Sequence, residues 1–502
     1  MTEQRNDPEP SRGRGRWIFL GPLLFVVLSL MPRPVGVTPE GQAALAMAGW
    51  MAAWWLTVAV PLAVTALLPL VLVPALGISG PASAAAPFAN PVIFLFMGGF
   101  FIAAAMRRWS LHRRIALAVV ARTGTSPRRL VAGFMLACAF LSMWMSNTAA
   151  TLMMMPIGAA VLSLVYANDA GERSGDVAQR SPDTRGLGTA LMLGIAYAGS
   201  IGGVATLIGT PPNAVLAAMA DELLHVDISF ARWMALALPV SIVMLVACWA
   251  LLCFVLFRLP ARPLAGVAQV IGTEQKKLGR WHPAERVTAL VFAAAAAAWI
   301  LRAPKQIGGV TIPGLQSLWP QAGDSTIAIA AALLLFIWPT RDRKGQRTTV
   351  LDWAYARSIP WDILVLFGGG LSLAAAFQST GLTTWLGGEL AVLAGLPDVL
   401  IIAAVAAAFV FVTEITSNTA TATLGLPVMA GLGASIGVEP LALMAAAAMG
   451  SSMAFMLPVA TPPNAIVYGT GYIEPAEMRR AGFWLNIMGI IVITVAVSIS
   501  LH

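Results

Sequence analysis

Two short polar motifs each occur twice in an otherwise apolar chain, and their residues are of types that bind ions and small polar molecules. The first is Ser-Asn-Thr, which lies at 146–148 and again at 417–419, near the middle of the long apolar runs 130–165 and 397–432. Hydroxyl and amide groups can donate to an anion or accept toward a cation. A single copy would most simply hydrogen-bond a neighbouring helix. Two copies at matching places favour a binding role.

The second motif is Thr-Pro-Pro-Asn, at 210–213 and 461–464, preceded by Gly209 in one copy and by Ala460 in the other. Proline lacks the amide hydrogen that a helix needs, and it disfavours helix in the residue before it. A simple proline kink would explain one copy, whereas the paired copies predict that each run is divided into two half-helices. The second half-helix then begins with proline in its first turn, where proline is common.

These four interruptions predict a site made of backbone NH groups, carbonyl oxygens and hydroxyls. Helix starts stabilise anions, and the carbonyls that end a half-helix can hold small cations. No Lys or Arg lies in the interrupted runs, so another group must balance the charge of an anionic ligand. Sodium ions bound beside the anion are the natural candidate. Two matching halves favour an elongated ligand with an anionic group at each end.

The composition indicates that the elements carrying these motifs lie in a membrane. Of the 502 residues, 58% are apolar and only 11% are charged, whereas about a quarter of an ordinary soluble protein is charged. This excludes a disordered chain, a coiled coil and a soluble enzyme. Because a span needs about 20 apolar residues, the chain is predicted to be an all-α polytopic membrane protein with about 11 transmembrane helices. The runs 130–165 and 397–432 are too long for one span and are predicted to form two re-entrant hairpins.

The basic residues predict the orientation of the chain. If the N-terminus is cytoplasmic and both long runs re-enter, 27 of the 31 Lys and Arg residues lie on the cytoplasmic side, in agreement with the positive-inside rule. If the long runs crossed the membrane, several Arg clusters would lie outside. We therefore expect a multi-pass protein of the cytoplasmic (inner) membrane, with a cytoplasmic N-terminus and an external C-terminus. The net charge of +8 reflects this topology and indicates no nucleic-acid partner.

An internal repeat relates the two halves of the chain. Three blocks of similar sequence recur in the same order, beginning at Phe94, Met145 and Gly209 in the first half and at Leu364, Thr416 and Ala460 in the second. The first half also carries an extra polar loop at 167–186. An odd number of predicted spans separates the copies, so the copies are expected to point in opposite directions. Inverted repeats with interrupted helices are typical of secondary transporters whose site lies at the membrane midplane.

The repeat also predicts how the chain is divided. The interrupted elements would form a transport core and the continuous helices a scaffold, joined by a basic amphipathic segment at the membrane surface. The predicted divisions are a cytoplasmic tail (1–16), a first scaffold segment (17–124), the first transport core repeat (125–257), a cytoplasmic linker (258–284), a second scaffold segment (285–396) and the second transport core repeat (397–502).

One acidic residue, Glu414, lies deep in a predicted span, three residues before the second Ser-Asn-Thr. A carboxylate inside a membrane is a candidate functional group. The corresponding position in the first half is Met143, and this lack of a counterpart favours a buried hydrogen-bonding role. The cysteines and histidines are scattered along the chain, so the sequence predicts neither a metal cluster nor a disulfide framework.

These motifs resemble those of the divalent anion/sodium symporter (DASS) family. The resemblance covers most of the chain and includes the stretch PLAVTALLPL at Pro61, the glycine-rich block at Gly368 and both Ser-Asn-Thr motifs. It implies a carrier of di- and tricarboxylates such as succinate, malate, fumarate and citrate, with sodium ions as coupling ions and no other cofactor. It also implies a homodimer in which the core moves against the scaffold by an elevator motion.

The resemblance further implies the residues of the site. The substrate carboxylates would be contacted by Ser146, Asn147, Thr148, Thr210 and Pro211, and by Ser417, Asn418, Thr419, Thr461 and Pro462. The first sodium site would comprise Ser142, Ser146, Asn147 and Gly209, and the second would comprise Thr413, Thr416, Asn418 and Ala460. Family members often have a small residue that contributes only its carbonyl at the position of Thr416, so the role of this side chain stays open.

The favoured function is sodium-coupled uptake of C4-dicarboxylates (succinate, malate, fumarate) across the cytoplasmic membrane. A sodium-independent dicarboxylate exchanger is the closest alternative, because the same fold hosts both, and citrate or sulfate are alternative substrates. An intramembrane enzyme would need acids, His or Cys clustered at membrane depth, and such a cluster is lacking. A channel is a further alternative, but hairpins paired with a rigid scaffold suit alternating access better.

Overall fold

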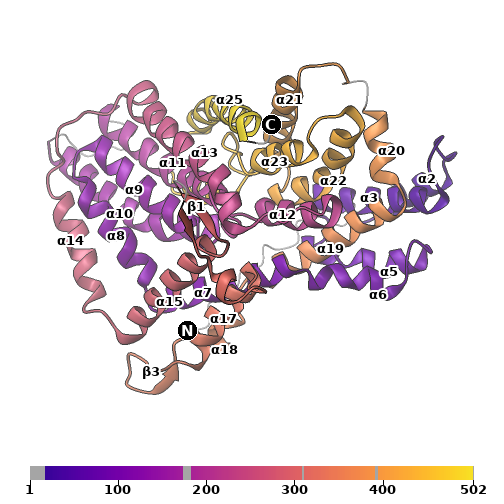
Figure 1. The fold of residues 1–502 in the computed structure, drawn as a ribbon. Helices are drawn as coiled ribbons and strands as arrows, with labels where there is room; N and C mark the ends of the chain where they lie inside the picture. Colours follow the sequence, from indigo (N-terminus) through magenta and orange to yellow (C-terminus); the bar gives the residue numbers. More distant parts are fainter. Residues whose placement is uncertain (1–16, 173–181, 308–309, 391–393, 501–502) are drawn as a thin grey trace.

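The computed structural model describes residues 17–172, 182–307, 310–390 and 394–500. The predicted cytoplasmic tail at 1–16 lies outside these residues, and so does the middle of the polar loop at 167–186. The described chain is mainly helical and includes two short antiparallel hairpins, β1–β2 and β3–β4 (Figure 1). The predicted all-α polytopic fold is confirmed.

Many of the helices begin with proline, whose fixed φ suits a first helical turn. Before residue 258 the elements are α2 (Leu20–Leu30), α3 (Pro39–Thr57), α4 (Leu62–Thr65), α5 (Leu68–Ala75), α6 (Pro81–Ala85), the 3₁₀ turn η1 (Ala86–Ala89), α7 (Pro91–Arg108), α8 (Leu111–Thr123), α9 (Pro127–Ser142), α10 (Asn147–Glu172), α11 (Pro182–Val204), α12 (Pro211–Leu224), α13 (Phe230–Ala250) and its π-helical continuation η3 (Leu251–Leu256).

The second half of the chain repeats this pattern after a surface helix. Its elements are α14 (Val267–Leu278), α15 (Pro283–Ile300), β1 (Lys305–Ile307), β2 (Val310–Ile312), α16 (Leu315–Leu318), α17 (Asp324–Ile337), β3 (Pro339–Arg341), β4 (Arg347–Thr349), α18 (Trp353–Ala356), α19 (Trp361–Ser379), α20 (Leu382–Glu389), α21 (Asp398–Thr413), α22 (Asn418–Ile436), α23 (Pro440–Gly450), α24 (Pro462–Tyr468) and α25 (Pro475–Ser500).

The helices are interrupted at all four polar motifs. A turn at the first Ser-Asn-Thr separates α9 from α10, and a turn at the second separates α21 from α22. The non-helical segments 205–210 and 451–461 separate α11 from α12 and α23 from α24. The predicted half-helices at the two Thr-Pro-Pro-Asn motifs are therefore confirmed.

The first scaffold segment was predicted to consist of continuous helices, but its apolar stretch at 60–78 does not form one. It forms two short helices, α4 and α5. Pro69 cannot donate the hydrogen bond that would join them, because it has no amide hydrogen. Pro74 lies within α5, and the chain turns soon afterwards at Gly77, whose φ of +70° favours glycine. The proline residues therefore divide this run into short helices, although its hydropathy would suit one long helix.

Within the described residues, eight helical segments are long and apolar enough to cross a membrane, by length and composition. Shorter apolar helices occur at α2, α4–α5, α17, α21 and α23. Because α21 and α23 belong to interrupted elements, the number of long helices is not the number of membrane crossings. One segment, in α11, is entirely buried inside the protein, so this helix belongs to the protein core.

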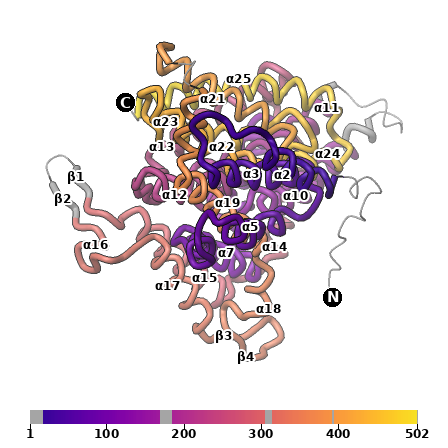
Figure 2. The backbone as a smooth tube through the Cα atoms, turned by 90° about the vertical axis from the view of Figure 1, so that its right-hand side faces the viewer, coloured from indigo at the N-terminus to yellow at the C-terminus, as the bar shows by residue number. Residues whose placement is uncertain are grey.

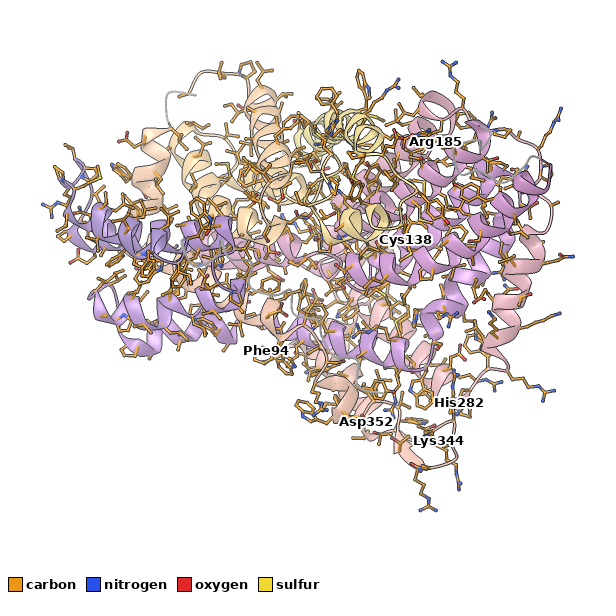
Figure 3. The ribbon with its side chains drawn as sticks, turned by 180° about the vertical axis from the view of Figure 1, so that it is seen from behind. Phe94, Cys138, Arg185, His282, Lys344 and Asp352 are labelled. Carbon is orange, nitrogen blue, oxygen red and sulfur yellow. The ribbon has the colours of Figure 1, made fainter. Side chains whose placement is uncertain are left out.

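The two repeats share that core. α11 packs against α9 and α10 of its own repeat and against α24 of the other. α12 contacts α22 and α23 of the second repeat and also α19, and α12 and α22 lie side by side in Figures 1 and 2. The labelled residues Arg185, His282 and Lys344 lie in the right half of Figure 3. The interrupted elements thus meet at the centre of the molecule.

Candidate functional site

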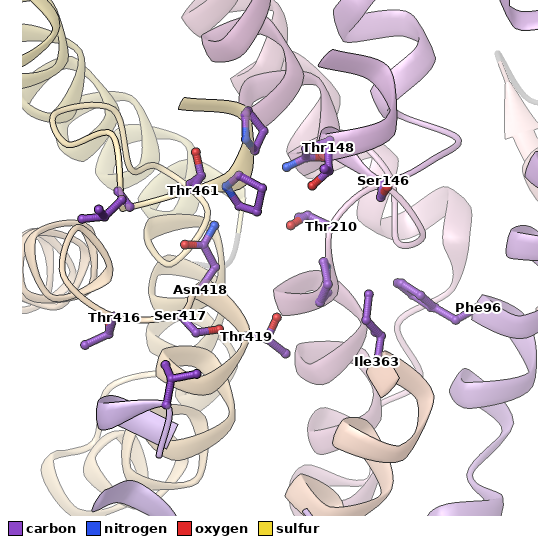
Figure 4. A pocket seen from close by; sticks show the side chains of 18 of the residues that line it. Phe96, Ser146, Thr148, Thr210, Ile363, Thr416, Ser417, Asn418, Thr419 and Thr461 are labelled. Atoms are coloured by element: carbon purple, nitrogen blue, oxygen red, sulfur yellow. The ribbon is translucent and has the colours of Figure 1, made fainter. Parts of the chain in front are cut away.

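Both recurring motifs line one cavity of about 450 Å³. All ten residues predicted to contact the substrate lie in its wall, five from each repeat. Phe96, Phe100 and Ile363 form another portion of the wall, and Figure 4 shows side chains of the two repeats facing each other across the space. A cavity of this volume suits a small metabolite.

Three long helices begin at this cavity. They are α10 at Asn147, α12 at Pro211 and α22 at Asn418. The first NH groups of a helix have no partner within it, and the dipole makes this end favourable for an anion. Thr210 and Ser417 are N-cap residues whose side chains make no capping hydrogen bond. Their hydroxyls therefore remain available to a ligand.

The described residues that line the cavity include no charged side chain. An anion here would be held by NH and OH donors, and hydrogen bonds to an anion are about twice as strong as neutral ones. An isolated charge away from water is nevertheless costly. A cation bound close to the anion would reduce this cost.

A cluster of oxygen atoms lies behind the first Ser-Asn-Thr. Ser142 Oγ is 2.8 Å from Asn147 Oδ1 and 2.6 Å from the main-chain O of Gly199. A hydroxyl has one proton, so it can donate to only one of these acceptors at a time. Several oxygen ligands close together are what small hard cations prefer. We call the group Ser142, Asn147 and Gly199 the first cradle.

The amide of Asn147 has two useful orientations. With Oδ1 directed into the first cradle, it adds an oxygen ligand suited to a cation. With its two amide atoms exchanged, Nδ2 would donate to Ser142 Oγ (2.8 Å), Gly209 O (3.2 Å) and Gly199 O (3.3 Å). The exchanged orientation satisfies these acceptors without a cation. The first cradle can therefore be stable both with and without a bound cation.

The second repeat contains the same arrangement. Thr413 Oγ1 is 2.8 Å from Asn418 Oδ1 and 2.9 Å from the main-chain O of Ser451. The hydroxyl again faces two acceptors with a single proton. We call the group Thr413, Asn418 and Ser451 the second cradle. Ser142 corresponds to Thr413 and Asn147 to Asn418 in the internal repeat. The carbonyl comes from Gly199 in the first cradle and, in the second, from Ser451, one residue after the counterpart of Gly199.

The remaining predicted sodium residues occupy other positions. Ser146, Gly209 and Ala460 line the cavity. Thr416 also lines it, but its Oγ1 pairs with Thr421 Oγ1 at 2.6 Å and donates to Val412 O at 2.7 Å. The Thr416 hydroxyl is therefore bonded within its own hairpin. The carbonyls of the two cradles were not predicted, because a main-chain oxygen leaves no signature in residue type.

The asparagine that ends each Thr-Pro-Pro-Asn motif forms hydrogen bonds to the non-helical segment before it. Asn213 Nδ2 donates to the carbonyls of Gly203, Val204 and Thr206 at 3.2, 3.0 and 2.7 Å. Both Asn213 and Asn464 are fully buried. These side chains satisfy carbonyls that lost their partners where the helix ended. The motif was recognised from the sequence, but this role for its last residue was not.

Asn464 acts in the same way in the second repeat. Its Nδ2 donates to the carbonyls of Ala454 and Leu457 at 3.2 and 3.0 Å. Each repeat therefore holds its non-helical segment by an amide from the following half-helix, and this fixes the start of the half-helix at the cavity.

Glu414 is buried and forms four hydrogen bonds. Its Oε1 accepts from the NH groups of Phe455 (2.7 Å) and Met456 (2.9 Å) and from Asn486 Nδ2 (2.8 Å). Its Oε2 accepts from the NH group of Leu457 at 3.1 Å. The predicted buried hydrogen-bonding role is confirmed. Glu414 is not among the residues that line the cavity.

Comparisons with known proteins agree with this architecture. The model of a family described as the sodium:sulfate symporter transmembrane region matches residues 17–500. A sodium-dependent dicarboxylate transporter, SdcS, of Staphylococcus saprophyticus is 41% identical over 483 residues, which cover 96% of this chain and 90% of the relative. SdcS of Staphylococcus aureus strain RF122 is 41% identical over 490 residues, which cover 97% and 91%.

Two solved structures share the fold at low sequence identity. The YdaH transporter of Alcanivorax borkumensis aligns over 97% of both chains with a TM-score of 0.55 and 14% identity. MtrF of Neisseria gonorrhoeae aligns over 97% of this chain and 94% of its own with a TM-score of 0.52 and 13% identity. At these identities the likeness concerns the fold alone.

Proposed function

The chain belongs to the divalent anion/sodium symporter family, and we propose that it couples inward movement of sodium ions to uptake of a C4-dicarboxylate such as succinate, malate or fumarate. It is a transporter and not an enzyme. The names of the relatives, sodium-dependent dicarboxylate transporters, support both the substrate class and the coupling ion.

The observation that carries this proposal is the matched pair of polar motifs on the two sides of one uncharged cavity. A C4-dicarboxylate has a carboxylate at each end, so each end would meet one Ser-Asn-Thr and the adjoining helix start. In the first repeat these donors are Ser146, Asn147, Thr148 and the Thr210–Pro211 break. In the second they are Ser417, Asn418, Thr419 and the Thr461–Pro462 break.

Sodium is proposed as cargo bound in the two cradles. Each cradle brings a hydroxyl, an asparagine side-chain amide and a main-chain carbonyl oxygen together. With its oxygen directed inward, the amide would supply the third oxygen ligand. Each also adjoins a Ser-Asn-Thr motif, so a cation there would lower the cost of placing a carboxylate beside it. This shared location would couple the two cargoes, because each binds more tightly when the other is present.

The proposed organisation follows the repeat. The transport core would comprise 125–257 and 397–502, and the scaffold 17–124 and 285–396, with 258–284 as the cytoplasmic linker. Contacts of α12 with α19 and of α22 with α3 would then lie between core and scaffold and change in an elevator motion. We also propose a homodimer in the cytoplasmic membrane, with a cytoplasmic N-terminus and an external C-terminus.

The alternative functions fit the site less well. A sodium-independent exchanger would use the same cavity but would bind no sodium ion in the two cradles, so their clustered oxygen atoms would have no role in transport. Sulfate is compact and does not need two matched sides, whereas citrate has a third carboxylate for which the cavity wall, within the described residues, offers no basic side chain. C4-dicarboxylates fit both the symmetry and the charge of the site better.

The direct test is uptake of radiolabelled succinate into proteoliposomes with and without an inward sodium gradient. We expect uptake that requires sodium and that unlabelled malate and fumarate inhibit more strongly than citrate or sulfate. Protein-free liposomes control for leakage. Uptake that is indifferent to sodium would establish the exchanger, and stronger competition by sulfate would overturn the substrate assignment.

A further inference from the structure

In each repeat a hydrogen bond joins the helix break to the residue that lies three positions before Ser-Asn-Thr, but the two hydrogen bonds use different groups. In the first repeat, Thr206 Oγ1 donates to the main-chain O of Met143 at 2.5 Å. In the second repeat, the equivalent positions are Leu457 and Glu414, and here the main-chain NH donates to a side-chain carboxylate at 3.1 Å. The same two points of the fold are therefore joined by a neutral hydrogen bond in one repeat and by a charged group in the other.

The carboxylate of Glu414 is surrounded by hydrogen-bond donors. Its hydrogen-bond partners, the NH groups of 455–457 and the amide of Asn486, are all donors. Among the ion pairs of the described residues, none involves Glu414. Within that portion of the chain, a buried negative charge thus stands without a basic partner.

This charge adjoins the second cradle through the backbone. Glu414 directly follows Thr413, whose hydroxyl belongs to that cradle. The segment it holds, 451–461, begins with Ser451, whose carbonyl completes the cradle, and ends beside Ala460 in the cavity wall. The carboxylate therefore fixes the segment that supplies one of the cradle oxygens.

We propose that Glu414 is the positioning residue that makes the second cradle the tighter of the two sodium sites. Its hydrogen bonds hold the 451–461 segment at the cradle, and its charge attracts a cation into it. The first cradle has only the neutral hydrogen bond of Thr206 to the Met143 carbonyl, because Met143 stands in the place of the carboxylate. This inference rests on the proposed function, since it takes sodium as the cargo of both cradles.

Other roles for Glu414 fit less well. A direct ligand of the substrate would line the cavity, and Glu414 does not. A role in holding the fold alone would leave the sodium dependence of transport unchanged, and this separates it from the proposal.

The test is the sodium dependence of initial uptake by Glu414→Gln. We expect the KM for sodium to rise about tenfold, equivalent to about 1.4 kcal/mol, with the maximal rate at saturating sodium within about threefold of the wild type. Glu414→Asp keeps the charge with a shorter reach and is expected to raise this KM about threefold. Glu389→Gln, which removes an exposed acid at the end of α20, should match the wild type.

A second measurement keeps the inference separate from the proposed function. Sodium-dependent thermal stabilisation of the purified proteins in detergent reports ion binding without transport or dicarboxylate. If the wild type shows no sodium response in either assay, the proposed function fails. If it responds and Glu414→Gln responds equally, or loses rate equally at every sodium concentration, this inference is wrong. Should Glu414→Gln not fold, Glu414→Asp carries the same comparison.

Discussion

The two repeats form one cavity from the same backbone frame but differ in the side chains that support it. Both place a hydroxyl between an asparagine amide and a carbonyl, and in both an asparagine of the following half-helix holds the break. They differ at Gly209 against Ala460 and at Met143 against Glu414. The shared features form the cradles and hold the breaks. The Gly209–Ala460 difference lies in the cavity wall, whereas the Met143–Glu414 difference changes how a break is held. Symmetry in the cavity is thus compatible with unequal ion sites.

The largest effect is expected from removing the Ser-Asn-Thr asparagine that both repeats share. Asn147→Ala and Asn418→Ala each delete the amide that serves both a cradle and the cavity wall. Loss of one partner in a buried polar network costs several kcal/mol, so we expect each variant to lose about 100-fold or more in succinate uptake. Initial rates in proteoliposomes provide the measurement.

Folding of these variants needs its own control. Ser163→Ala removes an exposed hydroxyl from the same helix as Asn147 and should transport normally, and thermal unfolding in detergent should show all three proteins folded. If both asparagine variants transported like the wild type, the assignment of the site to the two Ser-Asn-Thr motifs would be wrong.

The cavity was largely predictable because its residues recur. Paired Ser-Asn-Thr and Thr-Pro-Pro-Asn motifs are visible in the chain, and proline chemistry predicts where the helices break. The contacts that hold the breaks were not predictable. Glu414 reaches backbone NH groups some 41 to 43 positions away, and an NH group has the same identity at every residue. Gly199 and Ser451 likewise contribute through carbonyls, whose neighbours only the folded chain reveals.

The next effect tests a steric difference between the repeats. A Cβ added at Gly209 would lie 2.3 Å from the main-chain O of Gly203, so Gly209→Ala must displace the break in the first repeat. Overpacking of this kind costs about 1–3 kcal/mol, and we expect a roughly tenfold or greater loss of uptake. The second repeat already holds alanine at the corresponding position, and Ala460→Gly should stay within about twofold of the wild type. Equal losses in the two variants would contradict the steric difference.

A smaller effect compares the two cradle hydroxyls. Ser142→Ala and Thr413→Val each remove one oxygen ligand, but the second cradle keeps the attraction of Glu414. We therefore expect the KM for sodium to rise about tenfold for Ser142→Ala and about threefold for Thr413→Val, from losses of roughly 1.4 and 0.7 kcal/mol. Initial uptake measured across sodium concentrations separates them. The reverse order would mean that the hydroxyl and not the carboxylate dominates the second cradle.

The smallest effect is expected from removing the neutral hydrogen bond between Thr206 and Met143 in the first repeat. Thr206→Val removes the hydroxyl that donates to Met143 O while keeping the shape of the side chain. A neutral hydrogen bond contributes about 1 kcal/mol net, and only a fraction of this loss reaches the first cradle, so the KM for sodium should rise about twofold to threefold. Thr273→Val, which changes an exposed threonine of α14, serves as the matched control. Because Glu414→Gln removes a charged tie at the corresponding corner, its effect on sodium should exceed that of Thr206→Val. If the two variants shifted the sodium dependence equally, the charge would contribute nothing beyond the tie itself, and the two sites would be equivalent.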